Sequence, residues 1–165
     1  EDYDSIRLFY EKENVCVIRA ATKFFGLPGI RLGYAYARPN VVKTYNELSL
    51  PWRINAIADL AGRAIFKDSE YIRTSKEYIA QQRQFMLSEL KKIDGMKFYH
   101  TVTNFMLLKV LCCDEEELFG HLIQKGLLIR KASSFEGLDK TYVRIAIKDQ
   151  QSNIKLLNVL KENLR

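Results

Sequence analysis

The stretch RAATKFFGLPGIRLGYA, residues 19–35, holds a lysine, a loop broken by glycine and proline, and an arginine between two apolar runs. Lys23 and Arg31 lie eight residues apart, with the sequence GLPG at 26–29 between them. An ordinary surface loop does not need this arrangement. A site that holds one end of an anionic molecule and reacts with its other end does need it, so this stretch is the first candidate for a functional site.

The residue types at these positions indicate a particular chemistry. Thr22 and Lys23 directly follow an apolar run, 13–20, and we expect them to project into the crevice at the edge of a sheet. A lysine beside another cation becomes a better nucleophile, and the guanidinium fork of Arg31 suits a phosphate. Pyridoxal phosphate requires an amine for its aldehyde and a grip on its phosphate. The alternative is that Lys23 is an ordinary exposed lysine at the end of a strand.

The sequence TKFFGLPGIRLGYA resembles the cofactor-lysine signature of the fold-type I, class I/II aminotransferases. That signature has Ser/Thr-Lys, a glycine-rich loop, an arginine eight positions on and then Gly-Tyr. The resemblance implies that Lys23 binds pyridoxal 5'-phosphate, and that Arg31 and Thr22 contact its phosphate. Ala20 departs from the pattern, because relatives usually carry serine or threonine there, and one hydrogen bond to the phosphate is expected to be missing.

The resemblance continues along the chain. LPWRINAIADLAGRAIF (50–66) is similar to the helix between the large and small domains, and TNFMLLKV resembles a small-domain strand that places Asn104 near the cleft. The segments GLLIRKASSFEGL and YVRIAI look closest to histidinol-phosphate aminotransferase and threonine-phosphate decarboxylase. In both, Arg144 would bind the substrate α-carboxylate and Arg130 would face the substrate phosphate.

Part of the family's site has no counterpart in this sequence. The aspartate that pairs with the pyridine nitrogen, the aromatic residue that stacks on the ring, and the tyrosine and asparagine at the 3-hydroxyl all precede the lysine, and only twenty-two residues precede Lys23. We therefore expect an α/β chain that is the C-terminal part of a pyridoxal-phosphate-dependent transferase fold and is inactive alone. Its expected parts are a remnant of the large-domain sheet at 1–48, interdomain helices at 49–94 and a small α/β sandwich domain at 95–165.

The periodicity of apolar residues predicts the individual elements. We expect strands at 13–20, 30–37, 96–100, 104–113, 127–133 and 142–147, and helices at 39–48, 49–66, 69–93, 114–126 and 149–164. The helix at 49–66 is expected to begin through Ser49 and Pro51. Asp114 at capping-box spacing and Gly126 mark the ends of another, and Ile154, Leu157, Leu160 and Leu164 are expected to form the apolar face of the last. Strands alternating with helices after residue 95 indicate an open α/β or an α+β sandwich.

Composition excludes several classes of protein. The net charge of +6 comes from basic residues interleaved with acidic ones, so we expect a solvated surface and no nucleic-acid partner. No apolar run approaches the ~20 residues of a membrane span. The three cysteines, Cys16, Cys112 and Cys113, favour reduced thiols in the cytoplasm. His100 and His121 share no ligand spacing with any cysteine, so no metal site is expected.

The leading functional hypothesis is a pyridoxal-phosphate-dependent aminotransferase of the histidinol-phosphate type. It would transfer an amino group between a phosphorylated amine or an amino acid and a 2-oxo acid. Threonine-phosphate decarboxylase is one alternative, and a non-catalytic interaction module with the same fold is another, although Lys23 beside Arg31 weighs against the module. The resemblance also implies a homodimer, because relatives build the cofactor pocket from both subunits.

Overall fold

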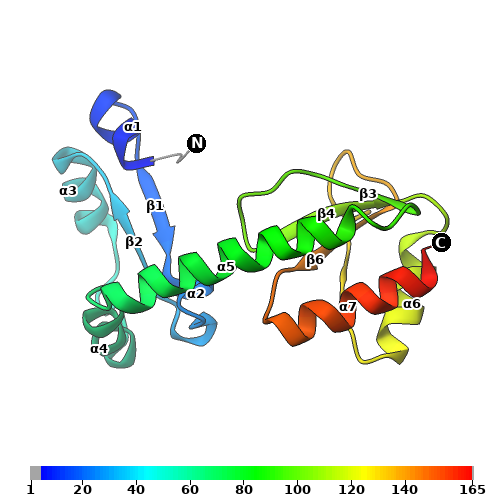
Figure 1. Ribbon diagram of the computed structural model, residues 1–165. Coiled ribbons are helices and arrows are strands. Elements are labelled where there is room, and N and C mark those ends of the chain that lie inside the picture. Colours follow the sequence, from blue (N-terminus) through cyan, green and yellow to red (C-terminus); the bar gives the residue numbers. More distant parts are fainter. Residues whose placement is uncertain (1–4, 165) are drawn as a thin grey trace. The chain divides into compact units, whose positions relative to one another are not determined.

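The computed structural model of the chain describes residues 5–164 (Figure 1). Helices and strands alternate in two compact units, the first ending at Ser69 and the second beginning at Glu70. The expected α/β class is confirmed. The three-part division at residues 48 and 94 stays a prediction. None of the helices within the described residues is long and apolar enough to cross a membrane.

The first unit contains short elements around a two-stranded sheet. In chain order they are α1 (Ser5–Glu11), β1 (Val17–Ala20), α2 (Ala21–Phe24), the 3-10 turn η1 (Pro28–Ile30), β2 (Gly33–Tyr36), α3 (Pro39–Leu48) and α4 (Ala56–Ile65). Strands β1 and β2 pair antiparallel, with Ala20 opposite Gly33. Both strands fall within the predicted runs 13–20 and 30–37. Because they pair with each other, the segment between them is a loop that connects two neighbouring strands of one sheet.

The predicted start of α4 is wrong. Residues 49–55 are not helical, and Trp52 has a φ of 56°, which a right-handed helix does not allow. Asn55 is the true N-cap, since its side-chain oxygen accepts a hydrogen bond from the backbone N–H of Ala58 at 2.8 Å. Ser49 instead follows the end of α3.

The core of the first unit is small. Ala21, Leu32 and Ala58 are buried, and Phe25, Ile30 and Ile65 pack against them. Of the strand residues only Val17 is buried, and every residue of β2 is exposed. The strand before Lys23 is therefore mostly exposed, although its sequence is apolar, because two paired strands cover too little surface to bury one another.

The second unit is a four-stranded antiparallel sheet with helices on one face (Figure 1). Its elements are α5 (Ser69–Leu90), β3 (Met96–Phe98), β4 (Phe105–Val110), α6 (Glu115–Gln124), β5 (Arg130–Lys131), β6 (Tyr142–Ala146) and α7 (Gln150–Asn163). The strand order is β3-β4-β6-β5. An antiparallel sheet covered by helices is the α+β form, one of the two arrangements that the sequence left open.

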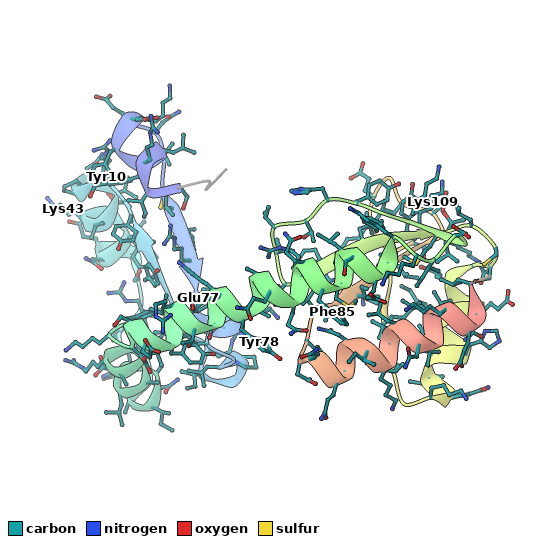
Figure 2. The ribbon with its side chains drawn as sticks, viewed as in Figure 1. Tyr10, Lys43, Glu77, Tyr78, Phe85 and Lys109 are labelled. Atoms are coloured by element: carbon teal, nitrogen blue, oxygen red, sulfur yellow. The ribbon has the colours of Figure 1, made fainter. Side chains whose placement is uncertain are left out.

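Alternation along the strands separates the core from an outer face. The buried residues of the sheet and helices include Met86, Leu90, Met106, Leu108, Leu118, Leu122, Val143, Ile145, Leu157 and Leu160. In β4 the buried Met106 and Leu108 alternate with Phe105 and Lys109, which face the other side. Figure 2 shows Lys109 on the side of the sheet away from α7. This outer face is therefore free of covering helices within the unit.

Both ends of α6 follow the predictions, whereas the apolar face of α7 follows them only in part. Asp114 accepts hydrogen bonds from the backbone N–H groups of Glu116 and Glu117, and Gly126 has the positive φ of 70° typical of a residue after a helix end. Leu157, Leu160 and Leu164 are buried as expected, but Ile154 is 41% exposed.

The buried Asn153 accounts for the orientation of α7. Its side-chain amide donates to Oε1 of Gln82 at 2.9 Å, and its carbonyl oxygen accepts the backbone N–H of Lys148 at 2.9 Å. These bonds bring the Asn153 face inward, so that the next residue, Ile154, points to the surface.

A pH prediction arises where α5 meets α7. Glu89 on α5 forms ion pairs with Lys92 and with Lys161, whose Nζ lies 2.8 Å from Oε2. Hydrogen bonds from Lys161 and Lys92 lower the pKa of Glu89 from its ordinary 4.5 to about 2. Because the folded-state pKa is lowered, these pairs stabilise the fold above pH 4.5, and their contribution is lost as the pH falls toward 2. We expect the free energy of unfolding, measured by urea denaturation, to fall more steeply over this range in the wild type than in Glu89→Gln.

The matched control for this prediction is Glu162→Gln. Glu162 is exposed on the same helix as Lys161, and no ion pair joins it to another described residue. This variant should keep the wild-type slope between pH 4.5 and 2. Equal slopes for wild type and Glu89→Gln would contradict the role assigned to Glu89.

Candidate functional site

Lys23 lies on α2, the single helical turn that follows β1. The backbone N–H of Ala21 donates to the carbonyl oxygen of Leu32 at 3.0 Å, which fixes the start of this turn against the β1–β2 connection. Thr22 is half-buried and Lys23 is exposed. Among residues 5–164 the Lys23 side chain has no ion pair or hydrogen-bond partner. Its amine is therefore available to a ligand.

Arg31 adopts an unusual backbone conformation at the end of η1. Its φ of 59° and ψ of 47° lie in the left-handed region, which costs a residue other than glycine about 1–3 kcal/mol. Its Nη1 donates to the carbonyl oxygen of Pro28 at 3.1 Å, and Nδ2 of Asn55 donates to the carbonyl oxygen of Ile30 at 3.4 Å. The carbonyl of Pro28 thus holds the guanidinium, and Asn55 holds the backbone just before a strained residue; strain of this kind is typical of binding sites.

Arg31 also borders a hollow in the first unit. The hollow has a volume of about 870 Å³, within the range of ligand pockets, and is lined in part by Tyr34, Tyr45, Trp52 and Arg53. Lys23 and Thr22 are not among its lining residues. Arg31, the residue predicted to bind the phosphate, therefore lines this hollow. Lys23 lies outside it, on α2.

Arg130 and Arg144 form a second cluster in the second unit. They lie directly opposite each other on β5 and β6, on the outer face of the sheet. Both guanidinium groups lie over the ring of Phe135, at 5.6 and 6.0 Å, and that of Arg144 lies 4.9 Å from the ring of Phe105. Like charges opposite each other repel, so this pair suits an anion with several oxygens.

Asn104 immediately precedes β4 in the same unit. Its backbone carbonyl accepts the N–H of Ile147 at 2.8 Å, and the next residue, Phe105, pairs with Ala146. Asn104 is therefore fixed beside Ile147, the residue that directly follows β6, the strand that carries Arg144. Thr22, Lys23 and Arg31 thus belong to the first unit, and Asn104, Arg130 and Arg144 belong to the second.

The reading of the sequence missed the residues that surround the two arginines. Phe105 and Phe135 supply the rings beneath them, and Oγ of Ser134 accepts a hydrogen bond from Nη2 of Arg130 at 3.2 Å. A signal was present, because NF and SSF flank the predicted strands. The contacts between the aromatic rings and the arginines depend on the register that pairs β5 with β6, and this register cannot be derived from the sequence.

Comparison with known protein families shows where the chain belongs. The model of aminotransferase class I and II matches residues 1–160. The chain belongs to this family. Within the family it is 40% identical over 159 residues to a Caldanaerobacter subterraneus subsp. tengcongensis protein provisionally named threonine-phosphate decarboxylase, and 35% identical over 154 residues to histidinol-phosphate aminotransferase of a Thermoanaerobacter species. These alignments cover 96% and 93% of the chain and 43% of each relative.

A solved structure of this aminotransferase family has the same fold. Histidinol-phosphate aminotransferase from Clostridium acetobutylicum superposes with a TM-score of 0.90 and 33% identity, over 96% of this chain and 48% of that one. The chain therefore spans about half the length of the relatives it matches. Family membership supports pyridoxal 5'-phosphate as the cofactor.

The side chains of this family member fit that cofactor chemically. Lys23 offers an amine that has no partner within residues 5–164, and Arg31 and Thr22 offer a guanidinium and a hydroxyl for the phosphate. Gly26 has a φ of 63°, and a Cβ added at Gly26 or Gly29 would meet no atom within 4 Å. The loop therefore has open space beside Gly26 and Gly29, which lie between Lys23 and Arg31 in the sequence.

Proposed function

We propose that the chain is the C-terminal portion of a pyridoxal-phosphate-dependent aminotransferase of the histidinol-phosphate type. The observation that carries this proposal is the pair Arg130–Arg144, two guanidinium groups held side by side over one ring in a chain that also has the Lys23–Arg31 motif. Together they provide anion sites for a cofactor and for a substrate that itself carries phosphate or carboxylate.

In this proposal the residues of the first unit serve the cofactor. Arg31 and Thr22 bind its phosphate, and Lys23 holds it by its aldehyde. Bound pyridoxal phosphate supplies an electron sink for charge that develops at the substrate α-carbon. The Lys23 amine would carry the α-proton as general base and then as general acid.

The residues of the second unit serve the substrate. Arg144 binds a carboxylate and Arg130 a phosphate, with Asn104 nearby, so the substrates are a phosphorylated amine or an amino acid and a 2-oxo acid. Histidinol phosphate has no carboxylate, and with that substrate Arg144 would act in the glutamate/2-oxoglutarate half-reaction. We also propose that the whole protein is a homodimer and is cytoplasmic.

Threonine-phosphate decarboxylase is the second candidate. The relative with 40% identity bears that name, against 35% for the aminotransferase. A phosphorylated amino acid carries both of the anionic groups that two arginines can bind at once. The two reactions differ in which bond at the α-carbon breaks, and residue types alone do not decide this.

The deciding experiment is a direct comparison of products. Full-length protein with added cofactor is incubated with histidinol phosphate and 2-oxoglutarate, and separately with threonine phosphate. Glutamate formation without release of CO₂ supports the aminotransferase, and CO₂ from threonine phosphate supports the decarboxylase. If neither product forms and no cofactor absorbance band appears, the non-catalytic module is the better description.

A further inference from the structure

One buried acidic side chain, Glu115, binds the backbone of the loop 132–140, which contains Phe135. Glu115, in the first turn of α6, is 2% exposed. Its Oε2 accepts the backbone N–H groups of Ala132 at 2.7 Å and Ser133 at 3.1 Å, and its Oε1 accepts the Ser133 hydroxyl. Its own backbone N–H donates to the carbonyl oxygen of Lys140 at 2.7 Å. Glu115 therefore holds the loop 132–140 at both of its ends.

This loop contributes two contacts to the arginine pair. The Phe135 ring lies beneath both guanidinium groups, and Ser134 accepts a hydrogen bond from Arg130. The backbone N–H of Phe135 donates to the carbonyl oxygen of Ala132 at 3.0 Å, the residue whose own N–H is held by Glu115. A short path of hydrogen bonds thus connects the buried carboxylate to the ring under the arginines.

We propose that Glu115 is a positioning residue for the Arg130–Arg144 anion site, acting through the loop 132–140 and the ring of Phe135. The inference rests on the proposed role of the two arginines in binding substrate anions. Glu115 itself does not touch the anion. It fixes the surface on which both guanidinium groups lie, so that less side-chain freedom is lost when an anion binds.

The chemistry of Glu115 suits this role. Burial alone would raise its pKa, but hydrogen bonds from Ser133 and Ala132 outweigh burial and lower the pKa, so the carboxylate is charged at neutral pH. The first turn of a helix also favours a negative charge. Removing this carboxylate would take the closer acceptor from the N–H of the buried Ala132, which would keep only the carbonyl oxygen of Tyr142 at 3.1 Å. It would also remove the acceptor of the Ser133 N–H and hydroxyl, so the loop would be held less tightly.

The neighbouring residue strengthens the attachment of α6 to β5. Glu116 forms an ion pair with Lys131, whose Nζ lies 4.6 Å from the centre of the Phe119 ring. Lys131 is adjacent to Arg130 in the two-residue strand β5. A strand of two residues forms few backbone hydrogen bonds of its own, so contacts with neighbouring elements help to hold it. The ion pair between Lys131 and Glu116, in the first turn of α6, is one of these contacts.

The test follows the side-chain N–H signals of Arg130 and Arg144 by NMR in the chain, titrated with inorganic phosphate. In the wild type the ring of Phe135 should shift these signals, and phosphate should move both. In Glu115→Ala we expect the ring-dependent shift to collapse and the Kd for phosphate to rise roughly tenfold, because both side chains must then be ordered on binding. Glu115→Gln keeps an acceptor oxygen for the two backbone N–H groups and should restore most of the shift and affinity.

Two further variants separate positioning from loss of fold. Glu117→Ala removes a charge from the same helical turn without touching the loop, and should leave both readouts unchanged. Phe135→Leu removes the ring but keeps the hydrogen bonds of Glu115, so it should have the same effect on both readouts as Glu115→Ala. It therefore tests the proposal even if the Glu115→Ala protein folds poorly.

The outcomes also separate this inference from the proposed function. Unchanged ring-dependent shifts in folded Glu115→Ala, or wild-type phosphate affinity in Phe135→Leu, would overturn the positioning role. Shifts that respond to Glu115→Ala in a chain that binds no phosphate would support the positioning of the pair and count against the proposed anion site.

Discussion

Replacing Lys23 with alanine is expected to abolish covalent attachment of pyridoxal phosphate to the full-length protein and to lower turnover by about 10³-fold or more. Lys23 is exposed on α2, and its amine has no partner among the described residues, so nothing in the chain competes for it. The variant loses both the nucleophile for the aldehyde and the group that moves the α-proton. Absorbance of the bound cofactor and product formation measure the two effects separately.

The matched control is Lys43→Ala. Lys43 is an exposed lysine of α3 in the same unit, and among residues 5–164 its only partner is Glu47 at 4.0 Å. It should keep the cofactor band and the activity, since an ion pair that exposed contributes little. A Lys23→Ala protein that still forms the band at wild-type strength would show that another lysine holds the cofactor, and the assignment of this motif would be wrong.

The position of the cofactor motif could be predicted because it depends on local chain chemistry. A lysine after a strand, glycines that allow a tight loop, and an arginine eight residues on are all visible in residues 19–35. The left-handed conformation of Arg31 was not visible, because no residue type demands it there. It is accompanied by hydrogen bonds to the carbonyl oxygens of Pro28 and Ile30, and the donor to Ile30 is Asn55, which lies 24 residues beyond Arg31 in the chain.

The arrangement around the second pair of arginines could be predicted only in part. Apolar alternation located β4 and β6, but β5 has just two residues, and a segment that short has no periodicity. Without the register that places Arg130 opposite Arg144, neither the shared ring nor the role of Glu115 can be inferred. A glutamate in the first turn of a helix ordinarily indicates a favourable charge at the helix end, and only tertiary contacts show that this one is buried.

Replacing Gly95 with alanine is expected to destabilise the second unit by about 1–3 kcal/mol. A Cβ at this position would lie 2.6 Å from the backbone oxygen of Leu164 and 2.9 Å from its carbonyl carbon. Leu164 is only 1% exposed and follows the last turn of α7, so its backbone cannot easily move away. The carbonyl oxygen of Gly95 also accepts the N–H of Leu111 at 2.9 Å, which resists a shift in the other direction. Urea denaturation of the variant measures the loss.

Gly120→Ala is the control, because it makes the same chemical change where there is space. Gly120 lies inside α6, and a Cβ there would meet no atom within 4 Å. Alanine in a helix is more stable than glycine by about 0.5–1 kcal/mol, so this variant should unfold at higher urea. Opposite signs at the two glycines would show that close approach to Leu164, and not loss of glycine as such, determines the effect. If Gly95→Ala were as stable as the wild type, the end of α7 would have to be free to move, and the packing of α7 beside β3 would be looser than the structure shows.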